Sequence, residues 1–265
     1  MGKIIAVVNQ KGGVGKTTTS VNLSAGLAFK GKKVLMVDID PQGNATSGIG
    51  VDRSGIRFSI YDCIINDIAA TQAVIPTSQD RLFCLPSHIS LAGAEIELVS
   101  MDRREYRLKE CIHSIRDDYD YIIIDCPPSL GLITVNAFAC ADSILIPIQC
   151  EYYALEGVSQ LMSTVKQVKK HLNPSLALEG VLATMYDTRT NLAIQVMDEL
   201  KKYFPDKLYA TAIPRNVRLS EAPSFGESIM SYDITSKGAD AYLALASEVI
   251  EANKRTSLAG GARAV

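Results

Sequence analysis

The sequence predicts an α/β fold: a doubly wound, mostly parallel sheet with helices on both faces, formed by a single domain. Short runs of Val, Ile and Leu recur along the 265 residues, and they are continuous rather than alternating, as expected of strands covered on both faces. Segments with helical spacing of apolar residues separate these runs. Such alternation is typical of parallel βαβ units with right-handed crossovers.

The elements follow one another along almost the whole chain. The expected strands are Ile4–Val8, Val34–Val37, Tyr121–Ile124, Ile144–Ile148, Gly180–Ala183 and Leu208–Ile213. The clearest expected helices are Lys16–Lys30, Asp102–Asp118, Leu155–His171, Asn191–Phe204 and Gly238–Asn253. No long linker interrupts the series, so residues 1–255 are expected to form one domain. The Gly- and Ala-rich tail 256–265 has little to bury and is expected to be disordered.

Composition excludes several classes of protein. Hydrophobic residues make up 47% and charged residues 21%, which is ordinary for a globular protein. The formal net charge of −2 means that any contact with nucleic acid must come from a local patch. The six cysteines have no CxxC spacing, which argues against a zinc site and favours a reducing cytoplasm. No apolar run is long enough for a membrane span or signal peptide, so a soluble protein is expected.

A glycine-rich loop lies between the first expected strand and the first expected helix, the context that a phosphate-binding loop requires. It reads NQKGGVGKTT from Asn9 to Thr18. Its glycines allow successive N–H groups to point at phosphate oxygens, and the helix dipole adds to the attraction. Lys16 can reach the β- and γ-phosphates, while the Thr17 hydroxyl can bind Mg²⁺. The predicted nucleotide contacts are Lys11, Gly12, Gly13, Val14, Gly15, Lys16, Thr17 and Thr18.

The loop departs from the common pattern at two positions. Gln10 stands where a glycine is usual, and Lys11 adds a second lysine. Because Lys16 already serves the bound nucleotide, Lys11 at the loop entrance is free to serve another one.

Three aspartates follow expected strands. Asp38 and Asp40 lie in DIDPQGN, and Asp125 ends the strand in IIIDCPP. Ligands of doubly wound sheets bind beyond the carboxyl ends of the strands, so these side chains are expected to converge on the phosphate loop. Asp125 has the position of an aspartate that holds Mg²⁺ directly or through water, and Asp38 is a candidate second Mg²⁺ partner. Asp40 is the candidate for orienting the attacking water.

The base is expected to be adenine. Guanine-specific sites use an Asn/Thr-Lys-x-Asp motif, and the near match Asn253-Lys254-Arg255-Thr256 lacks the aspartate. MgATP is therefore favoured over GTP as the ligand.

Taken together, KGGVGKTT, DIDPQGN and IIIDCPPSLG resemble the ParA/Soj partition ATPases of the deviant-Walker P-loop group. The segments CEYYALEG at 150–157 and IPRNVRLSEAPSFG at 213–226 are similar to later motifs of the same family. The resemblance runs from about Met1 to about Asn253. It implies slow ATP hydrolysis with Lys11, Lys16 and Asp40 as catalytic groups.

The resemblance also implies a nucleotide-sandwich homodimer. Lys11 would reach the partner's phosphates, where a cation neutralises dense negative charge as an arginine finger does. Gly12 would lie where the two loops nearly touch, so that a side chain there would clash. Pro214 and Asn216 match the adenine-side segment of the family.

DNA binding is a further implication of the resemblance. The family binds DNA non-specifically as the ATP dimer, is nucleoid-associated, and releases DNA after hydrolysis stimulated by a ParB/Spo0J-type partner. Arg189 and Arg218 match DNA-contacting positions of the family. The weaker candidates are Lys237, Lys254 and Arg255.

Departures from the relatives narrow the expectation, and two alternatives stay open. The loop begins at residue 9, which leaves no room for the N-terminal helix-turn-helix domain of some plasmid relatives. The C-terminal segment is not an apolar-basic amphipathic helix, so no membrane binding is expected. One alternative is a metabolic or electron-transfer ATPase, with Cys126 and either Cys140 or Cys150 holding an iron–sulfur cluster. The other is a scaffold that binds ATP without turnover.

Overall fold

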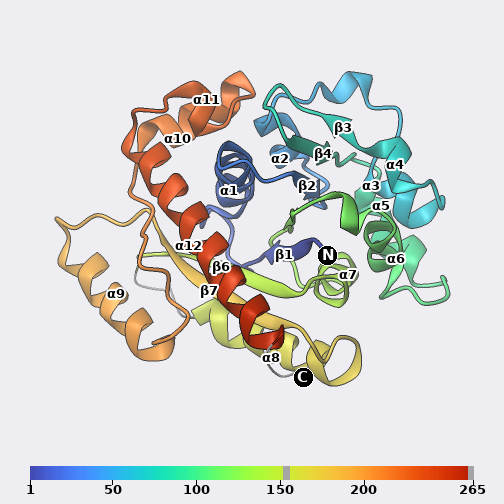
Figure 1. The fold of residues 1–265 in the computed structure, drawn as a ribbon. Coiled ribbons are helices and arrows are strands. Elements are labelled where there is room, and N and C mark those ends of the chain that lie inside the picture. Colours follow the sequence, from blue (N-terminus) through green and yellow to red (C-terminus); the bar gives the residue numbers. More distant parts are fainter. Residues whose placement is uncertain (152–155, 262–265) are drawn as a thin grey trace.

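A seven-stranded sheet forms the centre of the molecule in the computed structural model, which describes residues 1–151 and 156–261 (Figure 1). The strand order is β3-β4-β2-β5-β1-β6-β7, and all neighbours are parallel except β3 and β4. The strands are β1 Lys3–Val7, β2 Val34–Asp38, β3 Ile75–Pro76, β4 Leu82–Leu85, β5 Tyr121–Asp125, β6 Ser143–Gln149 and β7 Ala177–Thr184. This arrangement confirms the predicted fold class.

Helices cover both faces of the sheet, because the continuous apolar strands bury alternate side chains on opposite sides. Ile4 packs into the core beneath α6, α7 and α8, whereas its neighbour Ile5 packs beneath α1 and α12. The longer helices are α1 Lys16–Phe29, α5 Leu91–Leu98, α6 Arg107–His113, α7 Leu132–Cys140, α8 Glu156–His171, α9 Asn191–Tyr203 and α12 Lys237–Gly261. The short ones are α2 Asn44–Gly48, α3 Ile60–Ile65, α4 Ala70–Ala73, α10 Val217–Glu221 and α11 Ile229–Tyr232. None of the described helices is long and apolar enough to cross a membrane.

One predicted strand and one predicted helix were wrong. Residues 208–213 run beside β7 but make only isolated bridges, because the amides of Ala210 and Thr211 donate to Glu248 instead of to a strand. The stretch 102–118 is not a single helix: α6 covers its middle, and a 3₁₀ turn follows at Arg116–Asp118. Arg103 has a φ of 52°, which a right-handed helix cannot contain.

The carboxyl-terminal helix is longer than expected. Helix α12 continues to Gly261, beyond the predicted helix end at Asn253. The predicted domain end at residue 255 stays a prediction. Residues 262–265 of the predicted disordered tail lie outside the described residues. Leu155, the first residue of the predicted helix Leu155–His171, also lies outside them. The observed helix α8 begins at Glu156.

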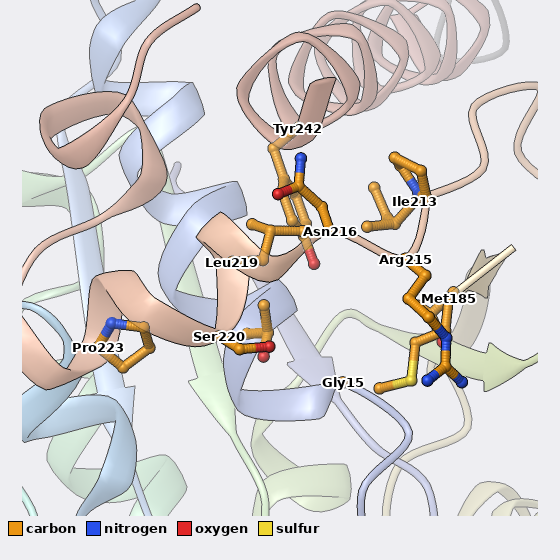
Figure 2. Close-up of a pocket in the computed structure, with 12 residues that line it drawn as sticks. Gly15, Met185, Ile213, Arg215, Asn216, Leu219, Ser220, Pro223 and Tyr242 are labelled. Carbon is orange, nitrogen blue, oxygen red and sulfur yellow. The ribbon is translucent and has the colours of Figure 1, made fainter. Parts of the chain in front are cut away.

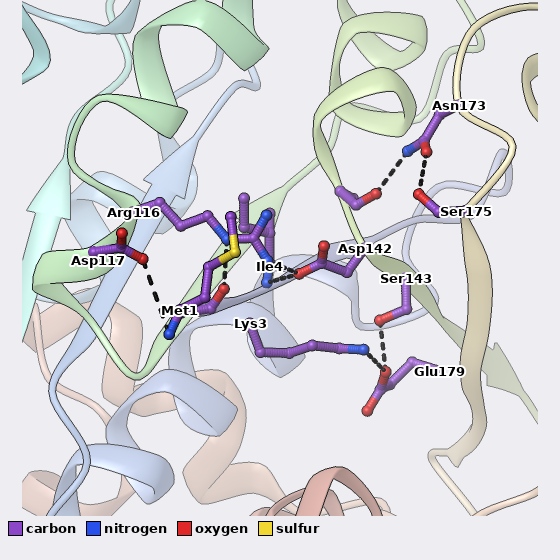
Figure 3. Close-up of polar contacts among 12 residues, drawn as sticks. Met1, Lys3, Ile4, Arg116, Asp117, Asp142, Ser143, Asn173, Ser175 and Glu179 are labelled. Carbon is purple, nitrogen blue, oxygen red and sulfur yellow. Dashed lines mark hydrogen bonds and ion pairs between the residues drawn. The ribbon is translucent and has the colours of Figure 1, made fainter. Parts of the chain in front are cut away.

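Polar contacts close the amino-terminal edge of the sheet (Figure 3). The Arg116 guanidinium lies 2.6 Å from the Asp142 carboxylate, which also accepts a hydrogen bond from the Ile4 amide. Lys3 pairs with Glu179 at 3.2 Å. These charges satisfy one another at the amino-terminal edge, whereas the phosphate loop and the strand-end aspartates lie at the opposite, carboxyl-terminal edge.

Candidate nucleotide site

The phosphate loop has the geometry that its glycines predict. It joins the end of β1 to the start of α1, with positive φ angles of 73° at Gly13 and 88° at Gly15. A Cβ built at Gly12 or Gly13 would meet no atom within 4 Å. The backbone of the loop is therefore open toward a pocket of about 500 Å³ at the N-terminus of α1, which we call the phosphate pocket.

Lys16 is the buried cation of this site. Only 7% of the residue is exposed, and its Nζ donates to the Lys11 carbonyl at 3.0 Å. Burial lowers the pKa of Lys16, and the nearby Asp125 opposes that shift. A buried ammonium held by one carbonyl is ready to exchange that contact for phosphate oxygens.

Hydroxyl and carboxylate oxygens meet beside Lys16. Thr17 Oγ1 donates to Asp125 Oδ2 at 2.9 Å, and Ser20 Oγ donates to Oδ1 of the same carboxylate at 2.8 Å. Burial and the neighbouring Asp38 raise the pKa of Asp125. Mg²⁺ prefers few protein oxygens together with substrate phosphates, so this pair fits a Mg²⁺ ion bound with a nucleotide. Among the described residues, no group of three or more His, Cys, Asp or Glu could hold a metal without such help.

The other two aspartates differ in their surroundings. Asp38 is fully buried beside Asp125, and its oxygens accept hydrogen bonds from the Asp40 amide and from both Thr46 N and Thr46 Oγ1. The role of Asp38 as a second Mg²⁺ partner stays a prediction. Because its oxygens already accept these hydrogen bonds, a contact with the ion through water is favoured over direct binding. Asp40 lines the phosphate pocket, as its predicted contact with the attacking water requires.

A second pocket, of about 430 Å³, which we call the base pocket, adjoins the first and shares Gly15, Thr18 and Met185 with it (Figure 2). Pro214 and Asn216 line this second pocket, as the sequence predicts for an adenine site. Asn216 also caps α10, since its Oδ1 accepts from the Arg218 amide at 2.8 Å. The largely apolar walls suit a purine ring, and the shared residues make the two pockets one continuous nucleotide site.

Lys11 does not line the phosphate pocket of its own chain. Its Nζ lies 3.9 Å from Glu151 Oε2, and Arg215 Nη2 lies 3.7 Å from Oε1 of the same carboxylate. The second lysine of the loop thus pairs with Glu151 and, unlike Lys16, does not line the phosphate pocket.

The two arginines predicted to contact DNA lie outside the nucleotide site. Arg189 precedes α9, and its side chain is 86% exposed while paired with Asp187 at 2.7 Å. Arg218 lies in α10 and pairs with Glu221 at 3.0 Å and Asp233 at 3.6 Å. Figure 1 draws α9 and α10 on the same side of the molecule. Lys237 begins α12 and Lys254 lies near its far end, so these weaker candidates are well separated.

Several residues of the site were missed from the sequence. Thr184 ends β7, and its Oγ1 donates to the Val14 carbonyl at 2.8 Å. Met185, with a φ of 50°, lines both pockets. The strand-end rule that located the aspartates could have found these two residues. Tyr242 lines the base pocket from α12, and no local pattern marks it. Glu151 pairs with Lys11 and lies in the segment CEYYALEG, whose resemblance to a family motif could have drawn attention to it.

The cysteines are arranged unlike ligands of a shared cluster. Cys126, Cys140 and Cys150 are 1%, 3% and 6% exposed, and burial raises the pKa of each thiol. A cluster held between two subunits needs thiolates at the surface. These contacts favour a structural role for the cysteines.

Comparisons with known proteins agree with this geometry. A family model described as an AAA domain matches residues 2–178. The chain is 61% identical to the sporulation initiation inhibitor protein Soj of Bacillus subtilis, over 94% of this chain and 98% of that protein. It is 53% identical to the chromosome partitioning protein ParA of Myxococcus xanthus, over 95% and 89%. The fold is similar to a crystal structure of cobyrinic acid a,c-diamide synthase from Mycobacterium smegmatis with bound ADP and magnesium, with a TM-score of 0.84, 37% identity and 96% of each chain covered.

Proposed function

The chain belongs to the Soj/ParA family of chromosome-partitioning ATPases, and we propose that it works as an ATP-driven switch for DNA binding. It is an ATPase that uses Mg²⁺. The observation that carries the proposal is that the two lysines of the phosphate loop have different surroundings. Lys16 is buried and lines the phosphate pocket, whereas Lys11 does not line that pocket and pairs with Glu151.

Within one chain the residues divide the work of hydrolysis. The open backbone at Gly12 and Gly13 and the Lys16 ammonium bind the phosphates. Thr17 and Asp125 hold Mg²⁺, which neutralises charge on the phosphates when bound. Asp40, at the wall of the phosphate pocket, orients the attacking water.

Two ATP-bound chains pair through their phosphate loops. Lys11 leaves Glu151 and contacts the partner's nucleotide, where it offsets the charge that develops during hydrolysis. The open space at Gly12 supports this arrangement, because no atom of the described residues lies within 4 Å of a Cβ built there and none of them excludes a larger residue. The Lys11–Glu151 pair is partly exposed and long, so it costs little to break.

The paired chains bind DNA without sequence preference through Arg189 and Arg218. Their carboxylate partners are exchanged for phosphate, and pairing of two chains doubles a patch that is too small in one chain. A ParB/Spo0J-type protein stimulates hydrolysis, which returns the chain to the state that does not bind DNA. The 61% identity to Soj favours this function over the metabolic alternative, because the identity to the synthase structure is lower, at 37%.

Replacement of the exposed arginine tests the DNA step. Arg189→Glu should bind ATP like the wild type but lose DNA binding in ATP at fixed moderate salt, measured by co-sedimentation. Arg103→Glu is the matched control, because Arg103 is also exposed and paired with a carboxylate but lies between α5 and α6. DNA affinity that is equal in both variants would remove Arg189 from the patch.

A further inference from the structure

A chain of buried hydrogen bonds connects the end of β4 to the aspartate at the phosphate pocket. Ser87 follows β4 by two residues, is fully buried, and donates from Oγ to the Asp40 carbonyl at 2.6 Å. Its amide donates to Thr46 Oγ1 at 3.0 Å, and Thr46 in turn donates to Asp38. Ser87 does not line the phosphate pocket or the base pocket.

These contacts fix the loop that carries Asp40 at several points. The Asp40 carbonyl also accepts from the Gly43 amide at 2.9 Å, and the Asp40 amide donates to Asp38 at 3.1 Å. Gly43 has a φ of 66° and leads into α2, so the backbone is free to turn there. Ser87 is the contact in this set that comes from outside the β2–α2 segment, since it lies two residues after the end of β4.

We propose that Ser87 is a positioning residue for ATP hydrolysis, which acts by holding the backbone of Asp40 and hence the carboxylate that orients water. The proposal rests on the proposed role of Asp40. Buried hydrogen bonds of this kind keep a catalytic group within a fraction of an ångström of its working position, and a displacement of about 1 Å can cost roughly 100-fold in rate. Because Ser87 is outside both pockets, its effect falls on turnover and not on ATP binding.

The experiment compares steady-state ATP hydrolysis by Ser87→Ala, Ser87→Thr and the wild type. Ser87→Ala keeps the amide contact to Thr46 and removes the hydroxyl that holds Asp40. We expect kcat to fall by roughly 10- to 100-fold with unchanged KM for ATP and an unchanged melting temperature. Ser87→Thr restores the hydroxyl and should recover most of kcat. Ser90→Ala is the control, since among the described residues its hydroxyl forms a hydrogen bond with His88 at the surface of the same loop.

Asp40→Ala, measured in parallel, separates failure of this inference from failure of the proposed function. Loss of turnover in Asp40→Ala with wild-type kcat in Ser87→Ala overturns the role of Ser87 alone. The role of Ser87 is also overturned if KM for ATP rises in Ser87→Ala by the same factor by which kcat falls. It is overturned as well if kcat falls by the same factor in Ser90→Ala. Wild-type turnover in Asp40→Ala overturns the role of Asp40 itself, on which the inference rests.

Discussion

Two buried residues of the site, Lys16 and Asp125, have opposite charges when ionised, and burial disfavours both charged forms. Lys16 must stay charged although it is buried, and Asp125 must lose its proton although burial raises its pKa. An anion placed beside Lys16 would therefore stabilise its charged form, and a cation placed beside Asp125 would stabilise the ionised carboxylate. In the proposed site MgATP supplies both, because its phosphates would pair with Lys16 and its metal with Asp125.

Lys16→Ala tests the need for Lys16 to stay charged. The variant should bind ATP roughly 10- to 100-fold more weakly, because charge-assisted hydrogen bonds of about 1.5–3 kcal/mol are lost. Isothermal titration with a non-hydrolysable ATP analogue measures the affinity. Equal affinity in the variant and the wild type would mean that the loop backbone alone binds the phosphates.

The need for Asp125 to lose its proton predicts that stability and Mg²⁺ binding depend on pH. Folding raises the pKa values of Asp38 and Asp125, so the metal-free folded chain binds more protons than the unfolded chain. Its free energy of unfolding should therefore decrease as pH rises above the ordinary carboxyl value of about 3.9. Mg²⁺ requires the ionised carboxylate, so the rise in melting temperature that Mg²⁺ gives to the ADP-bound protein should grow from pH 6 to pH 8.

Asp125→Asn provides the comparison for this measurement, because it has no proton to release. The effect of Mg²⁺ on its melting temperature should change less with pH than the effect on the wild type. The same pH dependence in both proteins would show that protonation of the nucleotide, and not of Asp125, is responsible.

At the scale of elements, the sequence predicts what depends on local pattern. The five strands β1, β2, β5, β6 and β7 were predicted because each is a continuous apolar run, and β3 and β4 were missed. The run Leu82–Leu85 is only four residues long, and its place in the sheet is set by pairing with β2. Likewise, the contacts of Ser87 with Asp40 and of Tyr242 with the base pocket join segments far apart in sequence, so no local pattern reveals them.

The packing of α1 against α12 gives an element-scale prediction. A Cβ at Gly26 would lie 3.1–3.3 Å from Met230, Tyr242 and Ala246, so the two helices approach closely there. Gly26→Val should lower the free energy of unfolding by roughly 1–3 kcal/mol, because overpacking forces side chains or backbone to shift. Urea denaturation measures this, with Gly55→Val as the control, since Gly55 has open space around it. Equal free energies of unfolding in the two variants would mean that α1 and α12 accommodate the added side chain without loss of stability.

At the scale of the whole molecule, the proposed function joins one nucleotide site to two surfaces. Lys11 and Gly12 belong to the phosphate loop, whereas Arg189 precedes α9 and Arg218 lies in α10. In the proposed switch, bound ATP acts through pairing of two chains, and pairing brings two weak DNA patches together. Net charge of −2 suits such a switch, because a single chain has no bulk attraction for DNA.

The most direct test of this account is co-sedimentation with two unrelated DNA sequences at one moderate salt concentration, in ATP, ADP or no nucleotide. The wild type should bind both sequences equally in ATP and neither in ADP or without nucleotide. Gly12→Val, in which a side chain occupies the expected contact between the loops, should bind ATP but not DNA. Binding that is independent of nucleotide, or absent in ATP although ATP is bound, would contradict the switch.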